Sequence, residues 1–356
     1  MLLSLHMLVL NGVSVLDRAL LPLAGVIDEL CFTDTGSTDG TIEKIHQIAW
    51  DMRISCKGVN WTPKTHPERY VLDLPETWQY PVPGPFTGLP ILRDWATARN
   101  ASLALCSGKY VMKLDADDEV LTPGNIHPSL KHLDSHPNID FLMCPYEVMD
   151  GKKIDILEMY TRLWRNHPER RFHHVLHEDL EGRYVDGSNW LMTLDGLFFR
   201  DWHDSPGIGT RIDHRNFKVL LLEYERCVAT GNPICPHVLI WLAEESLPFC
   251  PTLSLSLLTS HKIPDENRAW ASVIYGRACE AVHRPYDAME SYAQATSLGS
   301  LNGMLFKGFL QNKMNLAGWE SVLAVALQKA RHNSYIGVAR MSDIAKAEAL
   351  LSGKVI

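Results

Sequence analysis

The chain has 356 residues, of which 46% are hydrophobic and 21% are charged, and its formal net charge is −8. These values are typical of a globular protein of about two domains, and the net charge gives no overall attraction to nucleic acid or anionic membrane, although a local basic patch is still possible. The eight cysteines are scattered without a C-x-x-C pair, so we expect free thiols and a cytoplasmic protein.

The sequence opens with an apolar stretch, residues 2–10, which His6 interrupts and Asn11-Gly12 ends. It lacks the basic start and the small-residue cleavage site of a signal peptide, so it predicts a first buried strand. The sequence has no run of about 18 apolar residues, and we therefore expect no membrane span.

Strands and helices then alternate, as in α/β proteins. Strands are predicted at 27–33, from Tyr110 onward, at 140–147 and 157–164, and as a pair within 190–199. Helices are predicted at 13–23, 42–49, 93–107 and 123–136. A hairpin is predicted at 148–154, with Asp150-Gly151 as its turn.

Residues 57–92 break this alternation with many prolines and with Trp61, Trp78, Tyr80 and Phe86. Such a composition resists both helix and central strand. Long irregular insertions in compact domains are usually functional or disordered. We interpret this one as a loop near the mouth of a site, and a surface insertion without function is an equal alternative.

A polar loop, which reads D-T-G-S-T-D-G-T over residues 34–41, follows the second predicted strand and precedes a helix. Ser37, Thr38 and Asp39 can each cap that helix, and the glycines permit backbone conformations that other residues avoid. Such a loop is found in ordinary β-to-α connections. It is also typical of a nucleotide-binding loop, because ligands of open α/β sheets bind beyond the carboxyl ends of the strands.

An acidic run ends the strand that begins at Tyr110: Asp115, Asp117, Asp118 and Glu119 occupy four of five positions. Crowded carboxylates are unfavourable unless a positive charge lies among them, and a hard divalent cation with oxygen ligands would supply it. In an extended strand Asp115 and Asp117 would point to the same side. The alternative is a solvated acidic turn.

Together these motifs resemble those of family-2 glycosyltransferases with the GT-A fold. Residues 34–41 match D-x-G-S-T-D-G-T, residues 115–117 match D-x-D, and residues 94–100 (D-W-A-T-A-R-N) resemble F-A-x-A-R-N, with Trp95 in place of the usual Phe. The resemblance covers about the first 210 residues. It implies an α/β fold with a Rossmann-like mixed sheet and a nucleotide diphosphate sugar as donor, with a UDP-sugar favoured.

The resemblance also implies which residues hold the donor. By matching position, Asp34 contacts the base and ribose, and the backbone at Leu8, Val9 and Leu10 lines the base pocket. Arg99 matches the arginine that approaches the diphosphate. A guanidinium suits this role because it binds phosphate oxygens with two parallel hydrogen bonds.

For the metal, the resemblance makes Asp117 a ligand of Mn²⁺ or Mg²⁺ and places Asp115 against the ribose or a metal-bound water. His203 matches a histidine that completes the metal site in a related subgroup. There it lies in an I-x-H-Y-G-Y-like run, whereas here Asp204 and Ser205 follow it.

Residues 170–180 resemble the R-F-x-x-x-V-H-E segment of the subgroup with protein-glycosylating members. An acidic residue here deprotonates the acceptor, so Glu178 is the first candidate for the catalytic base and Asp179 the second. Three histidines within 173–177 would also allow a zinc site, but their spacing lacks a partner pair.

Beyond Asp213 the sequence predicts helices with short breaks, at 215–227, 236–245, 251–261, 266–282, 285–298, 316–330 and 338–351. Gly276, Ala288, Tyr292 and Ala295 match the spacing of a tetratricopeptide repeat, in which small residues let paired helices approach closely. We predict a GT-A domain over 1–210 and an α-helical, partly repeat-like domain over 211–356. In glycosyltransferases that the chain resembles, such a tail forms a homodimer or grips the acceptor; a stabilising appendage is the alternative.

The predicted function is a metal-dependent, inverting glycosyltransferase, a hexosyltransferase, that acts on a nucleophile of a protein, peptide or glycan. A modified (hydroxymethylated) DNA base is a second acceptor, as in viral DNA glycosylation. The observation that favours it is a cluster of basic and aromatic residues, Arg162, Trp164, Arg165, Arg170, Arg171 and Phe172.

Two hypotheses of other classes remain. One is a catalytically inactive helical-repeat interaction protein, which would show no metal-dependent donor binding. The other is a nucleotidyltransferase, which would need a basic glycine-rich loop near the start of the chain; Asn11-Gly12-Val13 does not provide it.

Overall fold

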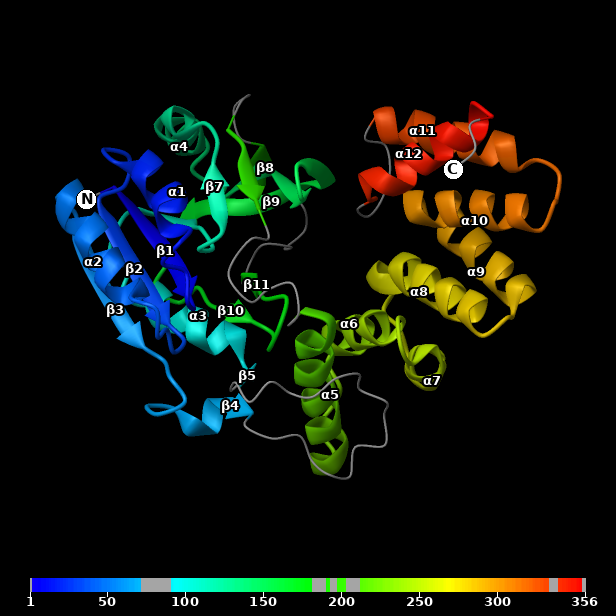
Figure 1. Ribbon diagram of the computed structural model, residues 1–356, viewed down its shortest axis with the longest axis horizontal. Helices are drawn as coiled ribbons and strands as arrows, with labels where there is room; N and C mark the ends of the chain where they lie inside the picture. Colours follow the sequence, from blue (N-terminus) through cyan, green and yellow to red (C-terminus); the bar gives the residue numbers. More distant parts are fainter. Residues whose placement is uncertain are drawn as a thin grey trace. The chain divides into compact units, whose positions relative to one another are not determined.

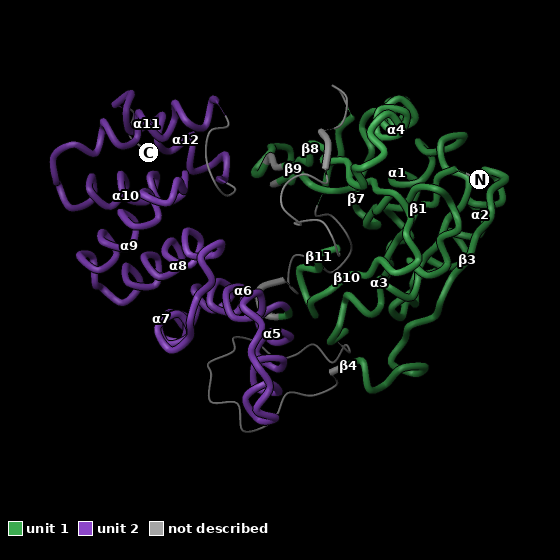
Figure 2. Tube along the Cα trace, turned by 180° about the vertical axis from the view of Figure 1, so that it is seen from behind, with its two compact units in different colours: residues 1–74, 86–215 green, residues 75–85, 216–356 purple. Residues whose placement is uncertain are grey.

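The computed structural model describes residues 2–71, 91–180, 190–192, 197–202, 212–332 and 339–353 (Figure 1). They form two compact units, an α/β unit that ends at Arg215 and a helical unit that begins at Asn216, shown in separate colours in Figure 2. The predicted fold class, a Rossmann-like mixed α/β sheet followed by an α-helical region, is confirmed. The expected boundary after residue 210 falls outside the described residues and stays a prediction.

The strands of the α/β unit are β1 Leu3–Val9, β2 Glu29–Asp34, β3 Ser55–Asn60, β4 Tyr70–Val71, β5 Ile91–Leu92, β6 Tyr110–Lys113, β7 Asp118–Val120, β8 Phe141–Asp150, β9 Lys153–Arg165, β10 Phe172–His173, β11 Asp179–Leu180, β12 Trp190–Met192 and β13 Phe199–Asp201. Its α-helices are α1 Leu16–Leu20, α2 Thr41–Met52, α3 Trp95–Leu103 and α4 Ile126–Asp134.

One nine-stranded sheet organises this unit, in the order β3-β2-β1-β6-β9-β8-β13-β7, with β12 paired to β8. β1 is parallel to both β2 and β6, and β2 is parallel to β3. β9 runs antiparallel to β6 and to β8, which makes the sheet mixed. Because β1 lies between β2 and β6, the loop after β2 and the acidic run after β6 both begin beside the end of β1.

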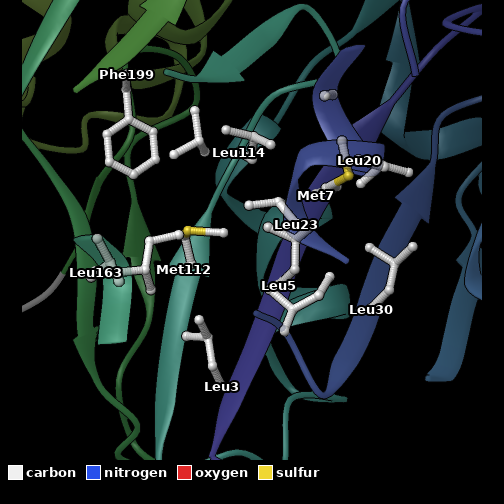
Figure 3. Packing of buried hydrophobic residues seen from close by; sticks show 14 of the residues in the cluster. Leu3, Leu5, Met7, Leu20, Leu23, Leu30, Met112, Leu114, Leu163 and Phe199 are labelled. Carbon is white, nitrogen blue, oxygen red and sulfur yellow. The ribbon is translucent and has the colours of Figure 1, made fainter. Parts of the chain in front are cut away.

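The two faces of β1 differ in character. All seven of its residues are buried. Leu3, Leu5 and Met7 point to the face that α1 and α2 cover, where they join the main hydrophobic core (Figure 3). On the opposite face, His6 Nε2 lies 2.9 Å from the carbonyl oxygen of Arg99 on α3. Burial, together with the nearby Arg99 charge, lowers the pKa of His6 to about 3, so its ring is neutral.

The sequence does not predict the edge strand β3, because Lys57, Gly58 and Asn60 are poor strand formers. The glycine is required by packing against the neighbouring strand. A Cβ atom on Gly58 would lie 2.3 Å from Cζ of Phe32 on β2. Tertiary contact therefore decides this element, and the local sequence does not.

The predicted hairpin turn is confirmed: Asp150 pairs with Lys153, and Gly151 adopts a positive φ of 58°. The two strands that it joins, β8 and β9, are longer than predicted. The strands predicted within 190–199 are each paired with β8, Trp190 opposite Phe141 in β12 and Phe199 opposite Tyr146 in β13.

Glu29, at the start of β2, is fully buried in a polar cluster. Its carboxylate pairs with Lys57 and accepts hydrogen bonds from Ser4 Oγ at 2.5 Å and from Ser107 N at 2.8 Å. Burial alone would raise the pKa of Glu29, but these contacts, led by Lys57, lower it to about 2. Because the pKa is lower in the folded state, Glu29 stabilises the fold above its ordinary pKa of 4.5, and this stabilisation is lost as the pH falls toward 2.

We predict that Glu29→Gln lowers the free energy of unfolding at pH 7 by roughly 2 kcal/mol. The substitution removes the negative charge to which Lys57 and the buried hydrogen-bond donors around Glu29 are paired. The variant should also lose less stability than the wild type between pH 5 and pH 3. Urea unfolding at both pH values measures this. Glu43→Gln, on the exposed face of α2, is the control and should change little. An unchanged pH dependence in Glu29→Gln would contradict the assignment.

The helical unit contains α5 Ile212–Thr230, whose first residues precede the unit boundary, and α6 Pro236–Ser246, α7 Pro251–Ser260, α8 Arg268–Ala281, α9 Pro285–Ser297, α10 Leu301–Lys313, α11 Trp319–Arg331 and α12 Met341–Leu351. From α6 to α12, each helix packs on the next, with the packed pairs including α8 with α9 and α10 with α11. No helix in the described part of the chain has the length and apolar character to cross a bilayer.

Small residues do let these helices approach closely, as predicted. A Cβ on Gly276 of α8 would lie 2.4 Å from Cε1 of Tyr292 on α9. A glycine also allows close approach of the helices α10 and α11, because a Cβ on Gly308 of α10 would lie 2.5 Å from Cδ2 of Leu323 on α11. The sequence does not predict α10, since its glycines lower helix propensity. The relation to tetratricopeptide repeats stays a prediction.

Gly276→Ala is expected to destabilise the protein by about 1–3 kcal/mol, the usual cost of overpacking. The Tyr292 ring has little room to move, because it is fully buried and its hydroxyl donates to Glu280 Oε1 at 2.6 Å. Gly124→Ala is the matched control, since no atom of the described residues lies within 4 Å of its added Cβ. Thermal melts of both variants measure the difference, and equal melting temperatures would contradict this packing.

Candidate functional site

The candidate site lies where the parallel strands β1, β2 and β6 end. Three segments begin there: the first loop at Leu10–Val13, the loop 34–41 after β2, and the acidic run after β6. Ligands of open α/β sheets bind at this edge. The topology therefore brings together segments that are far apart in the sequence.

Asp34 organises the loop that follows β2. Its side chain is buried, and its carboxylate accepts hydrogen bonds from the backbone N–H groups of Gly36 and Ser37, both at 3.1 Å. Gly36 has a φ of 112°, a conformation open to glycine. Asp34 thus fixes the loop by its own hydrogen bonds; its contact with a base or ribose stays a prediction.

The loop 34–41 is tied to the end of β1. Asn11 N donates to Ser37 Oγ at 2.9 Å, and Thr38 N donates to Asn11 Oδ1 at 2.8 Å. Gly12 N donates to Thr41 Oγ1 at 2.8 Å. These hydrogen bonds join the two loops at this edge of the sheet.

The three residues predicted to line the base pocket, at the end of β1, differ in exposure. Leu8 and Val9 have buried side chains, whereas Leu10 is 37% exposed. The carbonyl oxygen of Val9 accepts hydrogen bonds from the backbone and the hydroxyl of Thr35. Leu10 is therefore the member of this trio whose side chain can meet a ligand.

Aromatic residues from the start of the 57–92 insertion border the same loop. Trp61 N donates to the carbonyl oxygen of Asp34 at 2.7 Å, and the Trp61 ring stacks on His66 with 4.1 Å between centroids. The Tyr70 hydroxyl donates to the carbonyl oxygen of Thr35 at 3.0 Å. This part of the insertion thus lies beside the candidate site. Residues 72–90 are outside the described residues, so the predicted role of the rest of the insertion stays a prediction.

Arg99, on α3, forms ion pairs with two carboxylates from separate segments, Asp115 after β6 and Glu178 before β11. Asp94 caps this helix by accepting a hydrogen bond from Thr97 N at 2.9 Å. The Arg99 side chain is 6% exposed; its Nε donates to Glu178 Oε1 at 2.7 Å, and its Nη2 lies 2.9 Å from Asp115 Oδ1. The arginine predicted to approach the diphosphate is here bound to two carboxylates.

These ion pairs keep both carboxylates charged. Burial alone would raise the pKa of Asp115 and of Glu178, but the Arg99 charge, followed by that of Lys113, holds both pKa values below the ordinary range. Lys113 Nζ lies 3.7 Å from Asp115 Oδ2. Burial and the nearby Arg99 lower the pKa of Lys113 to about 8.

The two aspartates of D-x-D do not share one strand face, and that expectation is wrong. β6 ends at Lys113, and the chain turns at Ala116 and Asp117 before β7 begins. Asp115 is directed to Arg99, whereas Asp117 lies with two other carboxylates. The turn, which the sequence pattern does not predict, gives the Asp115 and Asp117 carboxylates different partners.

The second group of carboxylates consists of Asp117, Asp118 and Asp201. Each offers one side-chain oxygen, and these three oxygens lie within 4.8 Å of one another. Strand register places Asp201 of β13 opposite Asp118 of β7. Burial raises the pKa of Asp118 to about 7, and the charges of Asp115, Asp201 and Asp117 add to this, against the opposing effect of Arg162. A crowded set of oxygen donors of this kind fits a hard divalent cation such as Mg²⁺ or Mn²⁺.

Sequence reasoning missed Asp201. The residue stands two positions before His203, in the run R-D-W-H-D, but it becomes a candidate only through its pairing opposite Asp118. The predicted ligand His203 lies outside the described residues, so its role stays a prediction.

The predicted base, Glu178, is buried against Arg99, and the second candidate, Asp179, is half-buried at the start of β11. The preceding turn has two histidines with positive φ, His174 at 74° and His177 at 53°. Such conformations are uncommon outside glycine and mark a tightly constrained turn.

The basic and aromatic cluster proposed for DNA contact is largely internal. Trp164 and Phe172 are buried in a hydrophobic cluster, and Arg162 is 2% exposed. Arg170 is bound to Asp140, and Arg165 to Asp134. In this arrangement the cluster does not form a stacking surface for bases.

No family model matches the sequence. A TPR repeat-containing protein from Synechococcus elongatus is 25% identical over 194 residues, which are 53% of this chain. The match spans 39% of the length of that relative.

Solved structures with similar folds include TarS 1–349 from S. aureus in complex with UDP-GlcNAc, at 15% identity, a TM-score of 0.42 and coverage of 99% of this chain and 93% of that one. Another is glucosyl-3-phosphoglycerate synthase from Mycobacterium tuberculosis with Mn²⁺, UDP and glucosyl-3-phosphoglycerate, at 20% identity, a TM-score of 0.26 and coverage of 41% and 44%. Likenesses at this level do not decide the activity of this chain.

Proposed function

We propose that the protein is a metal-dependent glycosyltransferase of the GT-A type, which moves a sugar from a nucleotide diphosphate donor, with UDP-sugars favoured, to a nucleophile on a protein, peptide or glycan. One observation carries the proposal. The Asp34 loop, the Arg99–Asp115 pair and the Asp117–Asp118–Asp201 group, which come from separate parts of the chain, lie around the carboxyl ends of neighbouring parallel strands.

In this proposal Asp117 and Asp201, with Asp118 beside them, would hold Mn²⁺ or Mg²⁺, and His203 remains a predicted further ligand. When bound, the cation would offset the negative charge that develops on the leaving diphosphate. Asp34 and the backbone of Leu8–Leu10 would hold the base and ribose. Asp115, which is paired with Arg99, would contact the ribose or a metal-bound water.

The chemical step that we propose is an inverting displacement. The acceptor oxygen forms a bond to the anomeric carbon while the bond from that carbon to the phosphate oxygen breaks, and the electron pair leaves on the diphosphate. Glu178, charged because Arg99 and Lys113 lower its pKa, takes the proton of the acceptor. Arg99 holds the Glu178 carboxylate at 2.7 Å and so fixes its orientation.

The proposal is tested by incubating the purified protein with a panel of UDP- and GDP-sugars, with and without Mn²⁺, and measuring released nucleotide. Metal-dependent release from one donor supports a live transferase and identifies its sugar. If no donor is hydrolysed or bound in either condition, the result favours the alternative hypothesis of a catalytically inactive helical-repeat interaction protein.

A further inference from the structure

The strand β9 carries an irregularity beside the acidic run. Leu142 of β8 pairs with Leu163 of β9, but the next residue of β8, Met143, pairs with Thr161. The pairing thus skips one residue of β9. Arg162 is therefore an extra residue in β9, as in a β-bulge. Bulges re-aim side chains and are enriched next to active sites.

The bulged residue directs a buried guanidinium to the acidic run. Arg162 is 2% exposed, and its Nη1 lies 3.1 Å from Asp118 Oδ2 and 3.5 Å from Asp115 Oδ2. Its Cζ lies 4.1 Å from the centroid of the Tyr146 ring and 5.1 Å from that of Tyr160. The two rings hold the cation by cation–π contacts and restrict its position.

Both oxygens of Asp118 are occupied within this arrangement. The Tyr146 hydroxyl donates to Oδ1 at 2.7 Å, and the backbone N–H of Asp115 donates to Oδ2 at 2.9 Å. Arg162 adds its charge at Oδ2. The turn 115–118 is thereby held closed, with Asp115 on one side and Asp117 and Asp201 on the other.

We infer that Arg162 is a positioning residue for the metal site: it fixes Asp118 and Asp115 relative to each other, and so sets the affinity of the neighbouring carboxylates for a divalent cation. This inference rests on the proposed function. The shape of arginine matters here, because its planar guanidinium lies over the Tyr146 ring while one nitrogen, Nη1, approaches both carboxylates. Lysine is a point charge on a flexible stem and would not be held in the same way. Partners that orient metal-binding carboxylates typically contribute 10–100-fold to metal affinity.

Two physical effects oppose each other when Arg162 is changed. Loss of a positioning group weakens metal binding, but loss of a nearby positive charge strengthens it. Arg162→Lys separates them, since it keeps the charge and removes the planar group that lies against the Tyr146 and Tyr160 rings. Positioning predicts weaker Mn²⁺ binding in both Arg162→Lys and Arg162→Met; charge competition predicts tighter binding in Arg162→Met and little change in Arg162→Lys.

The experiment is a titration of the full-length protein with Mn²⁺, in the presence of UDP, in which free Mn²⁺ is followed by electron paramagnetic resonance. We expect the half-saturating Mn²⁺ concentration to rise about 10–100-fold in Arg162→Met, and by a smaller factor in Arg162→Lys. The matched control is Arg165→Met on the same strand, whose arginine pairs with Asp134 at 3.2 Å. It should melt at a lower temperature than the wild type and bind Mn²⁺ like the wild type.

A folded Arg162→Met protein that binds Mn²⁺ as well as Arg165→Met does, or more tightly, overturns the inference. If Arg162→Met does not fold, Arg162→Lys and Tyr146→Phe decide: a weaker Mn²⁺ affinity in both supports it, and wild-type affinity in both overturns it. Wild-type protein that binds no Mn²⁺ with any nucleotide overturns the proposed function as well, so the two failures are distinguishable.

Discussion

Asp117→Asn is expected to reduce sugar transfer by at least 100-fold while leaving the fold intact. The substitution keeps the size of the side chain but removes the negative charge from the Asp117–Asp118–Asp201 group. Changes to groups that only orient metal ligands cost about 10–100-fold, so loss of a ligand should cost at least the upper end of that range. The measurement is the rate of nucleotide release from the preferred donor at a fixed Mn²⁺ concentration.

The control for this variant is Asp51→Asn, on the exposed side of α2, where the carboxylate accepts a local hydrogen bond from Gln47. It should keep wild-type activity. Thermal melts should show that Asp117→Asn remains folded. Activity within a few-fold of wild type in a folded Asp117→Asn protein would remove Asp117 from the metal site.

Glu178→Gln is expected to lower the rate of transfer by about 10²–10⁴-fold, the usual contribution of a general base. An amide is nearly the same size but cannot accept the acceptor's proton. Donor binding, measured separately with UDP and Mn²⁺, should change far less than the transfer rate, because the base acts on the acceptor. Asp179→Asn is the matched comparison, and it should lose much less activity.

The pH profile gives a second test of Glu178. Burial would raise its pKa, but Arg99 and Lys113 lower it below its ordinary value of 4.5. Glu178 therefore stays charged as the pH falls, and the loss of activity on its protonation should come only below pH 4.5. A larger loss in Asp179→Asn than in Glu178→Gln would transfer the role of base to Asp179.

The sequence predicts the parallel strands of the core and the candidate site at their ends because the signals are local. The apolar run of β1 and the glycine-containing loop after β2 carry their own conformational preferences. The D-x-D run is equally visible. Their convergence follows from topology, since strands β2 and β6 flank β1 and both run parallel to it.

Other features depend on contacts between residues that are far apart in the sequence, and local sequence patterns do not predict such contacts. Asp201 becomes a candidate metal ligand only because β13 pairs with β7, and Arg162 reaches the acidic run only because β9 bulges. The pairing of Arg99 with Glu178 joins residues 79 positions apart. The helix α10 forms despite Gly303 and Gly308 because neighbouring helices pack closely on them. In each case tertiary contact outweighs the local preference.

The central claim, that this edge of the sheet binds a nucleotide diphosphate through a divalent cation, is tested most directly by calorimetric titration of UDP. Wild-type protein and Asp117→Asn are titrated side by side, each with Mn²⁺ and with a chelator. We predict wild-type binding that requires Mn²⁺ and is strongly weakened in Asp117→Asn. Binding of equal strength in the two proteins, or wild-type binding unaffected by the chelator, would contradict the claim.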